Sequence, residues 1–461
     1  MKTAQVIEDR ASAKPSKARK VAFEILLRVE KESSFASELL HGPATSTMSA
    51  RDAAFCTELV MGSLRWQILL DFIAQKLSRK PWLSFDPEIK VALRVGLYQL
   101  KFMQRTPARA AVYETVSLVK STGKRSAAGL VNALLRRAAQ MELTDLRLPS
   151  ISDMEWASIE CSHPLWLLNR WANRFGLENS LSLAKANNLP PKTSFRIRGD
   201  QSDRHEIESE LEKIGLTLFP GRYLKDCFVV QEGNIREALV LFSSKLVVQD
   251  EAAQIVPLLL DVRKGQTILD LCAAPGNKSD LLRQAAGDSG MVVVSDFHIH
   301  RLRAMGKFYS MDRIFRIALD GTQSLPFSES FDRILIDAPC SGTGTLRRHP
   351  EIKLKLTLDD IRQLSEKQAA LLDMAANALR PGGRMVYSTC SLEDEENRQV
   401  IERFLSRRKN FTLLPIRSEL GRLQPHFHPS AAAFIGQEYL ETFPDRDEMD
   451  GFFAAILLKS N

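Results

Sequence analysis

Residues 267–278, with the sequence TILDLCAAPGNK, decide the fold, because an apolar β-type run ends in Asp270 and passes directly into a turn of small residues. A helical pattern begins just beyond the turn, near Ser279. Small residues at a strand-to-helix turn let a ligand approach the backbone, and the helix N-terminus favours negative groups. The turn has neither the dinucleotide-binding G-x-G-x-x-G pattern nor the P-loop pattern. It predicts an α/β domain with a ligand site that suits the carboxylate of a nucleoside-linked amino acid.

The region around this turn repeats a rhythm of strand, glycine turn, helix and strand, which is typical of a doubly wound, Rossmann-like domain. We predict this domain over residues 241–461, with strands at residues 267–271, 291–295, 314–319, 333–336, 384–388 and 452–458. Asp296 ends the second strand, where a carboxylate can accept hydrogen bonds from two ribose hydroxyls. Asp320 ends the third strand. Acidic residues at three successive strand ends predict a single binding edge.

Two cysteines follow the next two predicted strands. The fourth strand leads into the sequence DAPCS, residues 337–341, and the fifth leads into STCS, residues 388–391. Ligands of open α/β sheets bind outside the carboxyl ends of the strands. Cys340 and Cys390 are therefore expected to face one pocket, although 50 residues separate them.

The residues before the sheet domain predict further parts. Residues 1–16 are rich in Ala, Ser and Lys and predict a tail without fixed structure. Apolar residues at i, i+3, i+4 and i+7 predict an all-α bundle over residues 17–140. A strand at 193–198 and a helix at 205–214 predict a small mixed α/β module over residues 150–240.

Charge and composition restrict the functional classes. The formal net charge is +7, and residues 1–140 carry 23 Lys and Arg against 12 Asp and Glu, so the N-terminal third is the basic part. Such asymmetry suits a polyanion. Candidate phosphate contacts lie near the predicted helix ends: Lys17, Arg19, Lys20, Lys120, Lys124, Arg125, Arg136 and Arg137.

Neither a membrane span nor a metal site is expected. No window has the roughly 18 consecutive apolar residues that a span needs, and the N-terminus lacks a signal-peptide pattern, so we expect a cytoplasmic protein. The six cysteines are too widely spaced for a zinc knuckle or a redox dithiol.

Together these motifs resemble the RsmB/Sun group of bacterial 16S ribosomal RNA 5-methylcytosine methyltransferases. The resemblance covers nearly the whole chain, and its motifs are highly specific in combination. They are residues 272–278 (CAAPGNK), 337–341 (DAPCS), 347–353 (RRHPEIK), 389–391 (TCS) with Glu395, Glu396 and Asn397, and 450–453 (DGFF). The N-terminal bundle resembles the NusB-type RNA-binding domain of such enzymes, and residues 248–254 (VQDEAAQ) resemble the segment leading into their catalytic domain.

The resemblance implies that the cofactor is S-adenosyl-L-methionine and that the partner is 16S rRNA. The protein would bind this rRNA either free or in a partly assembled small subunit. We expect a monomer without metal. Residues implied to contact the cofactor are Cys272, Ala273, Ala274, Pro275, Gly276, Asn277, Lys278, Asp296, Asp320 and Asp337, with Arg301 as a weaker candidate. Asn277 departs from the family, which usually has a second glycine there. If that position needs a positive backbone angle, Asn is the next most tolerated residue.

By the same resemblance, Cys390 is the nucleophile and Cys340 assists release. Thiolate addition at carbon 6 of cytosine makes carbon 5 able to attack a methyl group. A free thiol is only a few per cent ionised at neutral pH, so Lys278 or a nearby Arg is expected to lower the pKa of Cys390. Asp337 either binds the cofactor or supports the ring nitrogen of the base, and both roles stay open. Cys272 is expected to be mostly structural.

The nucleophile can reach carbon 6 only on an unstacked base, so a loop, bulge or partly unfolded rRNA segment with the target cytosine flipped outward is expected. Arg347, Arg348, His349 and Lys353 are candidates to hold the flanking phosphates. Adenine-N6 methyltransferases carry an Asn/Asp-Pro-Pro-Tyr motif where this chain has Cys340. A DNA cytosine methyltransferase would carry its nucleophile after the fourth strand. A non-catalytic RNA chaperone or antitermination factor would not need the cysteine pair.

Overall fold

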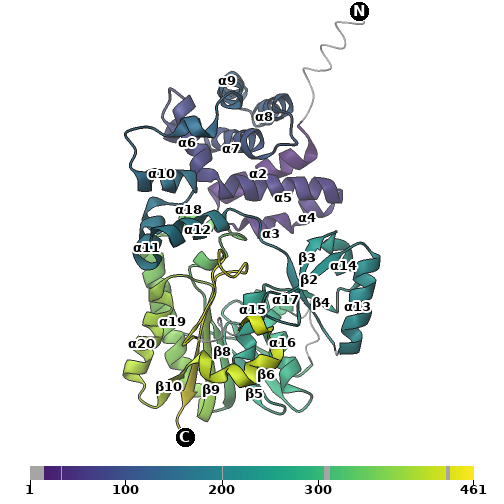
Figure 1. Cartoon of the computed structure of the whole chain (residues 1–461), viewed down its shortest axis with the longest axis vertical. Coiled ribbons are helices and arrows are strands. Elements are labelled where there is room, and N and C mark those ends of the chain that lie inside the picture. The colour runs from purple at the N-terminus through teal and green to yellow at the C-terminus, as the bar shows by residue number, and fades with distance from the viewer. Residues whose placement is uncertain (1–14, 33, 200, 306–311, 432–436) are drawn as a thin grey trace, which may run out of the picture. The chain divides into compact units, whose positions relative to one another are not determined.

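The computed structural model describes residues 15–32, 34–199, 201–305, 312–431 and 437–461 (Figure 1). The chain forms two compact units, one of Met1–Pro190 with Leu346–Lys355 and one of Pro191–Thr345 with Leu356–Asn461. All but two residues of the predicted tail, residues 1–16, lie outside the described part.

The first unit is helical in its described part, as predicted for its N-terminal portion. Its core helix is α7, which presents an almost unbroken buried run from Val91 to Gln99 to its neighbours. The amphipathic helix α2 packs against it with Val21, Ile25 and Val29. The α-helices are α2 (Lys17–Lys31), α3 (Ala36–Leu40), α4 (Pro43–Ser46), α5 (Ala50–Arg65), α6 (Gln67–Leu77), α7 (Pro87–Phe102), α8 (Ala108–Ser121), α9 (Ala128–Ala139), α10 (Asp153–Glu160), α11 (Leu165–Phe175), α12 (Leu177–Asn187) and α18 (Ile352–Lys355).

The helical unit extends beyond the predicted boundary near residue 140. Trp156 of α10 makes an edge contact with Phe72 of α6, with ring centroids 6.2 Å apart. The hydroxyl of Ser162 accepts hydrogen bonds from the backbone N–H groups of Ile68, at 3.0 Å, and Leu69, at 3.4 Å. These contacts group residues 150–190 with the bundle, whereas the sequence had assigned them to the following module.

A segment from the catalytic part of the chain also belongs to the helical unit. In residues 346–355, Lys353 is 1% exposed, and its Nζ donates to the carbonyl of Arg65 at 2.9 Å and to Asn188 Oδ1 at 3.1 Å. Glu351 accepts from the backbone N–H of Ala36 at 2.8 Å. Burial, helped by the Arg65 guanidinium, lowers the pKa of Lys353 well below its usual value. This amino group is a structural tie within the unit.

We expect the free energy of unfolding to rise more steeply with pH for the natural protein than for Lys353→Met. Because folding lowers the pKa of Lys353, the unfolded chain holds the extra proton, so stability increases with pH below about 10.5. The slope contributed by this one proton is at most about 1.4 kcal/mol per pH unit. Urea unfolding between about pH 7 and 9 measures the difference, and parallel pH profiles for the two proteins would contradict it.

The second unit begins with a small module built on a four-stranded antiparallel sheet of order β2-β3-β1-β4. Its strands are β1 (Ser194–Ile197), β2 (Thr217–Pro220), β3 (Cys227–Glu232) and β4 (Leu246–Val248), and its helices are α13 (Gln201–Lys213) and α14 (Ile235–Leu241). Phe195, Leu211 and Ala238 form its core. The buried Arg196 donates to Asp280 of helix α16 (Asn277–Ala286) at 2.5 Å and so joins the module to the catalytic domain.

The catalytic domain is built on an eight-stranded sheet of order β10-β12-β9-β8-β5-β6-β7, with β11 paired to β12. Strands β5 to β9 are parallel, and β12 is antiparallel to β9 and β10. The strands are β5 (Thr267–Asp270), β6 (Met291–Asp296), β7 (Ile314–Ala318), β8 (Phe331–Asp337), β9 (Leu379–Thr389), β10 (Phe411–Leu414), β11 (Leu440–Glu441) and β12 (Phe453–Lys459). All six predicted strands are therefore present, whereas β10 and β11 were not predicted.

Helices cover both faces of this sheet (Figure 1). Alternate strand residues face opposite sides, so that Ile268 packs with α15, α16 and α17 while Leu269 packs with α19 and α20. The helices are α15 (Glu251–Leu258), α16 (Asn277–Ala286), α17 (Ile299–Met305), α19 (Leu358–Ala378), α20 (Arg398–Arg407) and α21 (Leu420–Leu423). Within the described ranges, no helix combines the length and apolar character needed to cross a bilayer.

Candidate active site

The two cysteines predicted to share a pocket lie side by side. Cys340 follows β8 and Cys390 follows the adjacent parallel strand β9, and their Sγ atoms are 3.4 Å apart. Both side chains are partly exposed. The backbone N–H of Gly344 donates to the carbonyl of Cys390 at 2.9 Å, which joins the two turns directly. The strand register, rather than any sequence proximity, brings the sulfurs together.

The surroundings of Cys340 favour its protonated form. The contact with Cys390, followed by burial and the nearby charge of Glu396, holds the pKa of Cys340 well above its usual value. Cys340 therefore keeps its proton at neutral pH and can donate it toward the sulfur of Cys390. Burial likewise raises the pKa of Cys272 well above its usual value, in keeping with the expectation that this thiol is structural.

Lys278 and Asp337 form an ion pair beside the cysteine turns. Lys278 Nζ lies 2.5 Å from Asp337 Oδ2, and the other carboxylate oxygen accepts from Ser388 Oγ at 2.9 Å. The same ammonium lies 5.2 Å from the ring centroid of Phe452. From the sequence, Lys278 is expected to lower the pKa of Cys390. The described interactions of Lys278 include no direct contact with Cys390, and its partner is the carboxylate of Asp337, which ends β8.

The turn after β5 has the shape expected of a ligand cradle. Gly276 adopts a φ of +105° and begins α16, so a side chain there would be strained, while Asn277 is not among the described residues with positive φ. The departure at Asn277 therefore costs no backbone strain. Its side chain donates to the carbonyl of Val248 at 3.2 Å. Ala273 donates from its backbone N–H to Ser295 at 2.8 Å, which holds the turn against β6.

Carboxylates surround this turn. Asp270 is fully buried, its Oδ2 accepts from Ser279 Oγ at 2.7 Å, and its Oδ1 has no partner in the described part of the chain. Burial raises the pKa of Asp270 to about 7. Arg301 donates to Asp296 at 3.2 Å and to the carbonyl of Ala274 at 2.9 Å, so it braces the cradle. Asp320 is exposed and accepts from the backbone N–H of Thr322 at 3.0 Å.

The basic segment at residues 347–353 does not match its predicted role. Arg347 is 6% and Lys353 is 1% exposed, so neither can hold phosphates of an RNA strand, and that expectation is wrong for both. The ring of His349 packs edge-on against Phe35, with centroids 5.9 Å apart. In sequence, the segment resembles a solvent-exposed run of charges. Only the tertiary structure shows that Arg347 and Lys353 are buried in the helical unit.

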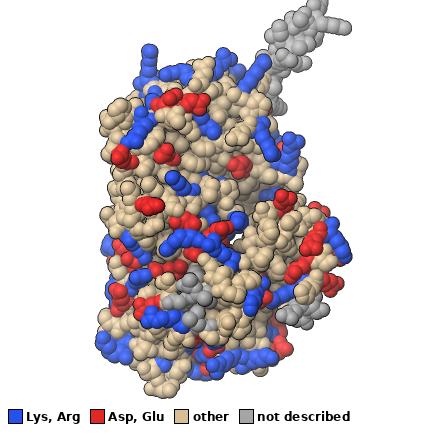
Figure 2. Space-filling model, in the orientation of Figure 1, with Lys and Arg blue, Asp and Glu red and all other residues tan. Residues whose placement is uncertain are grey.

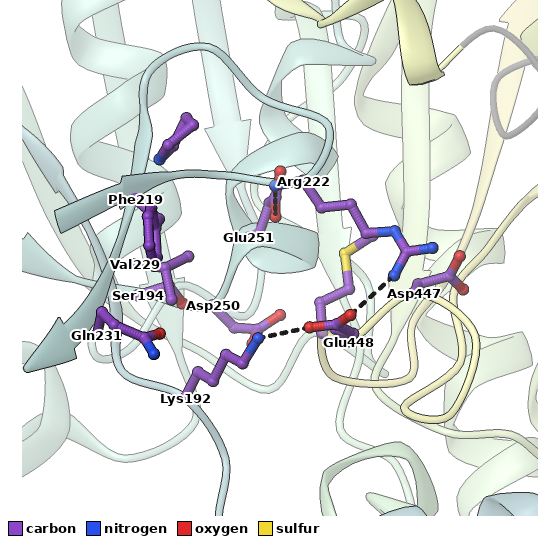
Figure 3. A pocket seen from close by; sticks show the side chains of 12 residues that line it. Lys192, Ser194, Phe219, Arg222, Val229, Gln231, Asp250, Glu251, Asp447 and Glu448 are labelled. Atoms are coloured by element: carbon purple, nitrogen blue, oxygen red, sulfur yellow. Dashed lines mark hydrogen bonds and ion pairs between the residues drawn. The ribbon is translucent and has the colours of Figure 1, made fainter.

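A cavity of about 270 Å³ lies elsewhere in the second unit (Figure 3). Neither active-site cysteine lines it. Its charged groups are largely matched to each other, since Glu448 pairs with Lys192 at 2.6 Å and with Arg222 at 3.2 Å. Glu251 accepts backbone hydrogen bonds from residues 222–224. The cavity therefore marks the joint between the small module and the catalytic domain.

The sheet order, the small-residue turn and the carboxylates at successive strand ends define an S-adenosylmethionine-dependent methyltransferase. The residues present fit this cofactor: the Oδ1 of Asp270 is open to accept a hydrogen bond from it, the α16 N-terminus suits its carboxylate, and Asp296 suits ribose hydroxyls. A family model described as 16S rRNA methyltransferase RsmB/F matches residues 257–458. The NusB family model matches residues 16–140, and the ferredoxin-like domain of RsmF/B-like methyltransferases matches residues 163–235.

Full-length relatives agree with these matches. The chain is 36% identical to ribosomal RNA small subunit methyltransferase B of Pseudomonas putida, over 89% of this chain and 91% of the relative. It is 31% identical to the probable ribosomal RNA small subunit methyltransferase B of Bacillus subtilis, over 97% of this chain and 99% of the relative. The chain belongs to the RsmB/F family of 16S rRNA methyltransferases, and its methyl donor is S-adenosyl-L-methionine. The predicted family is thereby confirmed.

A solved structure supports the fold over the whole chain. The protein titled "Crystal Structure of PH0851" superposes with a TM-score of 0.79 at 23% identity, covering 97% of this chain and 99% of that one. At this identity the match supports the arrangement of helices and strands alone.

The contacts also identify residues that the sequence did not single out for a role. Glu396 accepts a hydrogen bond from the backbone N–H of Ser341, and Ser388 donates one to Asp337. Gln368 of α19 donates to the carbonyl of Pro339, the residue before Cys340. Glu396 was visible only as part of a motif, although a serine directly after each cysteine was a usable signal for a shared partner.

Proposed function

We propose that the chain methylates carbon 5 of a cytosine in 16S rRNA through a covalent bond between Cys390 and carbon 6 of the base. The observation that carries this proposal is the 3.4 Å separation of the Cys340 and Cys390 sulfurs beside the cofactor cradle. One thiol attacking the base does not explain a second thiol in contact with it. A pair that attacks and then releases explains both.

In the first step, the thiolate of Cys390 bonds to carbon 6, and the displaced ring electrons make carbon 5 nucleophilic. When bound, the cofactor would supply the methyl group: carbon 5 bonds to the methyl carbon as the bond from that carbon to the sulfonium sulfur breaks, and the sulfur keeps the electron pair. The negative charge that develops on the ring needs a partner. Asp337, whose carboxylate is balanced by Lys278, is suited either to support the ring nitrogen or to contact the cofactor.

In the release step, the proton on carbon 5 leaves, the carbon 5 to carbon 6 double bond reforms, and the bond to Cys390 breaks. Cys340 gives its proton to the departing sulfur and accepts the proton from carbon 5, so both residues end as thiols. Loss of one proton from Cys390 to solvent restores the attacking thiolate. The high pKa of Cys340 supports this assignment, because the proton is present when the Cys390 sulfur departs.

The proposal is tested by bisulfite mapping of 16S rRNA from a strain lacking this protein. We expect one cytosine that resists conversion in the parent strain to become convertible in the deletion strain, and to regain resistance when the gene is restored. An unchanged bisulfite map would contradict the assignment. Light scattering of the purified protein tests our further expectation of a monomer.

RNA affinity is proposed to depend on exposed cations of the helical unit. Lys120, Arg125 and Arg136 are exposed, whereas Lys124 pairs with Asp86 and Arg137 donates to the carbonyl of Leu77. Figure 2 shows basic side chains spread over the visible face with acidic ones among them, rather than one continuous basic surface. A few exposed cations are thus the natural phosphate contacts.

We expect Lys120→Gln, Arg125→Gln and Arg136→Gln together to weaken RNA binding and flatten its salt dependence. Each lost phosphate contact with single-stranded RNA reduces the slope of log affinity against log salt by about 0.7. Fluorescence anisotropy with an rRNA fragment at several salt concentrations measures the slope. Replacing three exposed acidic residues of α19, Asp359→Asn, Asp360→Asn and Glu366→Gln, is the matched control. A slope equal to that of the natural protein would show that other residues bind the RNA phosphates.

A further inference from the structure

One buried carboxylate contacts the turns of both active-site cysteines. Glu396 is 0% exposed and lies just after the Cys390 turn. Its Oε1 accepts from the backbone N–H of Ser341 at 2.8 Å, and its Oε2 accepts from the hydroxyl of the same serine. Oε2 also accepts from Ser391 Oγ at 2.5 Å. Because Ser341 follows Cys340 and Ser391 follows Cys390, a single side chain holds the residue after each thiol.

A second layer of hydrogen bonds secures this arrangement. Gln368 of α19 donates both to Glu396 Oε1 at 3.0 Å and to the carbonyl of Pro339 at 2.9 Å, so it also holds the residue before Cys340. The hydroxyl of Tyr387 donates to the carbonyl of Glu396 at 2.5 Å. On the other turn, Asn397 donates to the carbonyl of Ser391 at 2.8 Å. Both cysteine turns are therefore fixed relative to one another through Glu396 and its neighbours.

The free-energy cost of burying the Glu396 carboxylate indicates that this residue has a role beyond packing. A buried carboxylate is unfavourable unless it is well hydrogen-bonded, and burial raises the pKa of Glu396 against the opposing effect of its serine and glutamine donors. Four donated hydrogen bonds converge on its two oxygens. A neutral side chain of the same shape could not accept all four, because an amide nitrogen donates rather than accepts.

We infer that Glu396 is a positioning residue of the reaction, whose carboxylate holds the turns after β8 and β9 so that the two sulfurs face each other. It acts through Ser341 and Ser391, and the described contacts place it against neither sulfur. The consequence for catalysis rests on the proposed two-thiol function, whereas the consequence for thiol spacing does not. Two separate readouts therefore distinguish the two ideas.

The first readout is the rate at which the folded protein forms a Cys340–Cys390 disulfide with diamide. The two thiols lose two protons and two electrons, which reduce the diazene to a hydrazine. In the natural protein the adjacent sulfurs should react readily. In Glu396→Gln the loosened turns lower the effective concentration of one thiol at the other, so we expect pairing to be about tenfold slower or more. Glu402→Gln, the same change at an exposed residue of α20, is the control.

The second readout is the multiple-turnover rate of RNA methylation at saturating RNA and cofactor, which includes the release step that needs Cys340. We expect Glu396→Gln to lower this rate by about ten- to a hundredfold while RNA affinity stays unchanged. Thermal unfolding shows whether the variant is folded. If Glu396→Gln does not fold, Ser341→Ala and Ser391→Ala remove the contacts one at a time, and each should slow both disulfide formation and methyl transfer.

The outcomes separate clearly. Slower disulfide formation together with slower methyl transfer supports the inference. Slower disulfide formation with unchanged multiple-turnover methylation supports the positioning by Glu396 and contradicts the two-thiol mechanism. A disulfide rate equal to that of the Glu402→Gln control, whatever the methyl transfer rate, overturns the inference.

Discussion

Cys390→Ala is expected to abolish methylation of 16S rRNA, with a fall of at least about a thousandfold in the single-turnover rate, equivalent to about 4 kcal/mol of transition-state stabilisation. Without a thiolate at this position, carbon 5 of the base is not activated and cannot take the methyl group. Transfer of radiolabelled methyl groups to rRNA from a deletion strain measures the rate. Binding of RNA and of the cofactor should persist, because the loss is chemical.

The matched control is Cys56→Ala, which removes a buried thiol from the helical unit and leaves the catalytic turns intact. We expect that variant to retain its activity with some loss of stability. Normal turnover by Cys390→Ala would remove the covalent mechanism from consideration.

Cys340→Ser is expected to trap the protein on its substrate. The attack by Cys390 and the transfer of the methyl group do not need Cys340, but the release step does. A serine hydroxyl gives up its proton far less readily than a thiol, so the bond between Cys390 and carbon 6 should persist. A denaturing gel should show a slowly migrating, ribonuclease-sensitive adduct, and turnover beyond the first cycle should fall by about a hundredfold or more.

The double variant Cys340→Ser with Cys390→Ala provides the control for this trap, because it has no sulfur with which to bond the base. It should give no adduct on the same gel. Rapid multiple turnover by Cys340→Ser without an adduct would assign the second thiol to packing or to cofactor binding.

Much of the catalytic domain was predictable because its strands are apolar runs separated by turn residues and helices. The six predicted strands match observed ones to within about five residues, and most of them are buried on both faces, which gives continuous apolar runs. The short strands β2, β4 and β11 carry too little pattern to be recognised alone. The antiparallel direction of β12 was also out of reach, because strand direction depends on the path of the chain between strands.

The candidate site also has features that the sequence predicted and features that it could not predict. Asp270, Asp296 and Asp337 stand at strand ends, which the sequence pattern located, and the cysteine turns follow directly from the strands. The pairing of Lys278 with Asp337 was not predictable, because it joins residues 59 positions apart. The burial of Lys353 was missed for a related reason: a run of charged residues predicts exposure unless its partners are known.

The sequence by itself determined the parts of this protein that depend on local pattern: the helical bundle over residues 17–140, the sheet domain, the small-residue turn and the two cysteines at neighbouring strand ends. Only the tertiary structure decided which groups meet. The packing of adjacent strands set the sulfurs 3.4 Å apart, and the Glu396 carboxylate joined the two turns that carry them. The reason is physical, because periodicity reports which face of an element is apolar, whereas a hydrogen bond between distant residues depends on how complete elements pack.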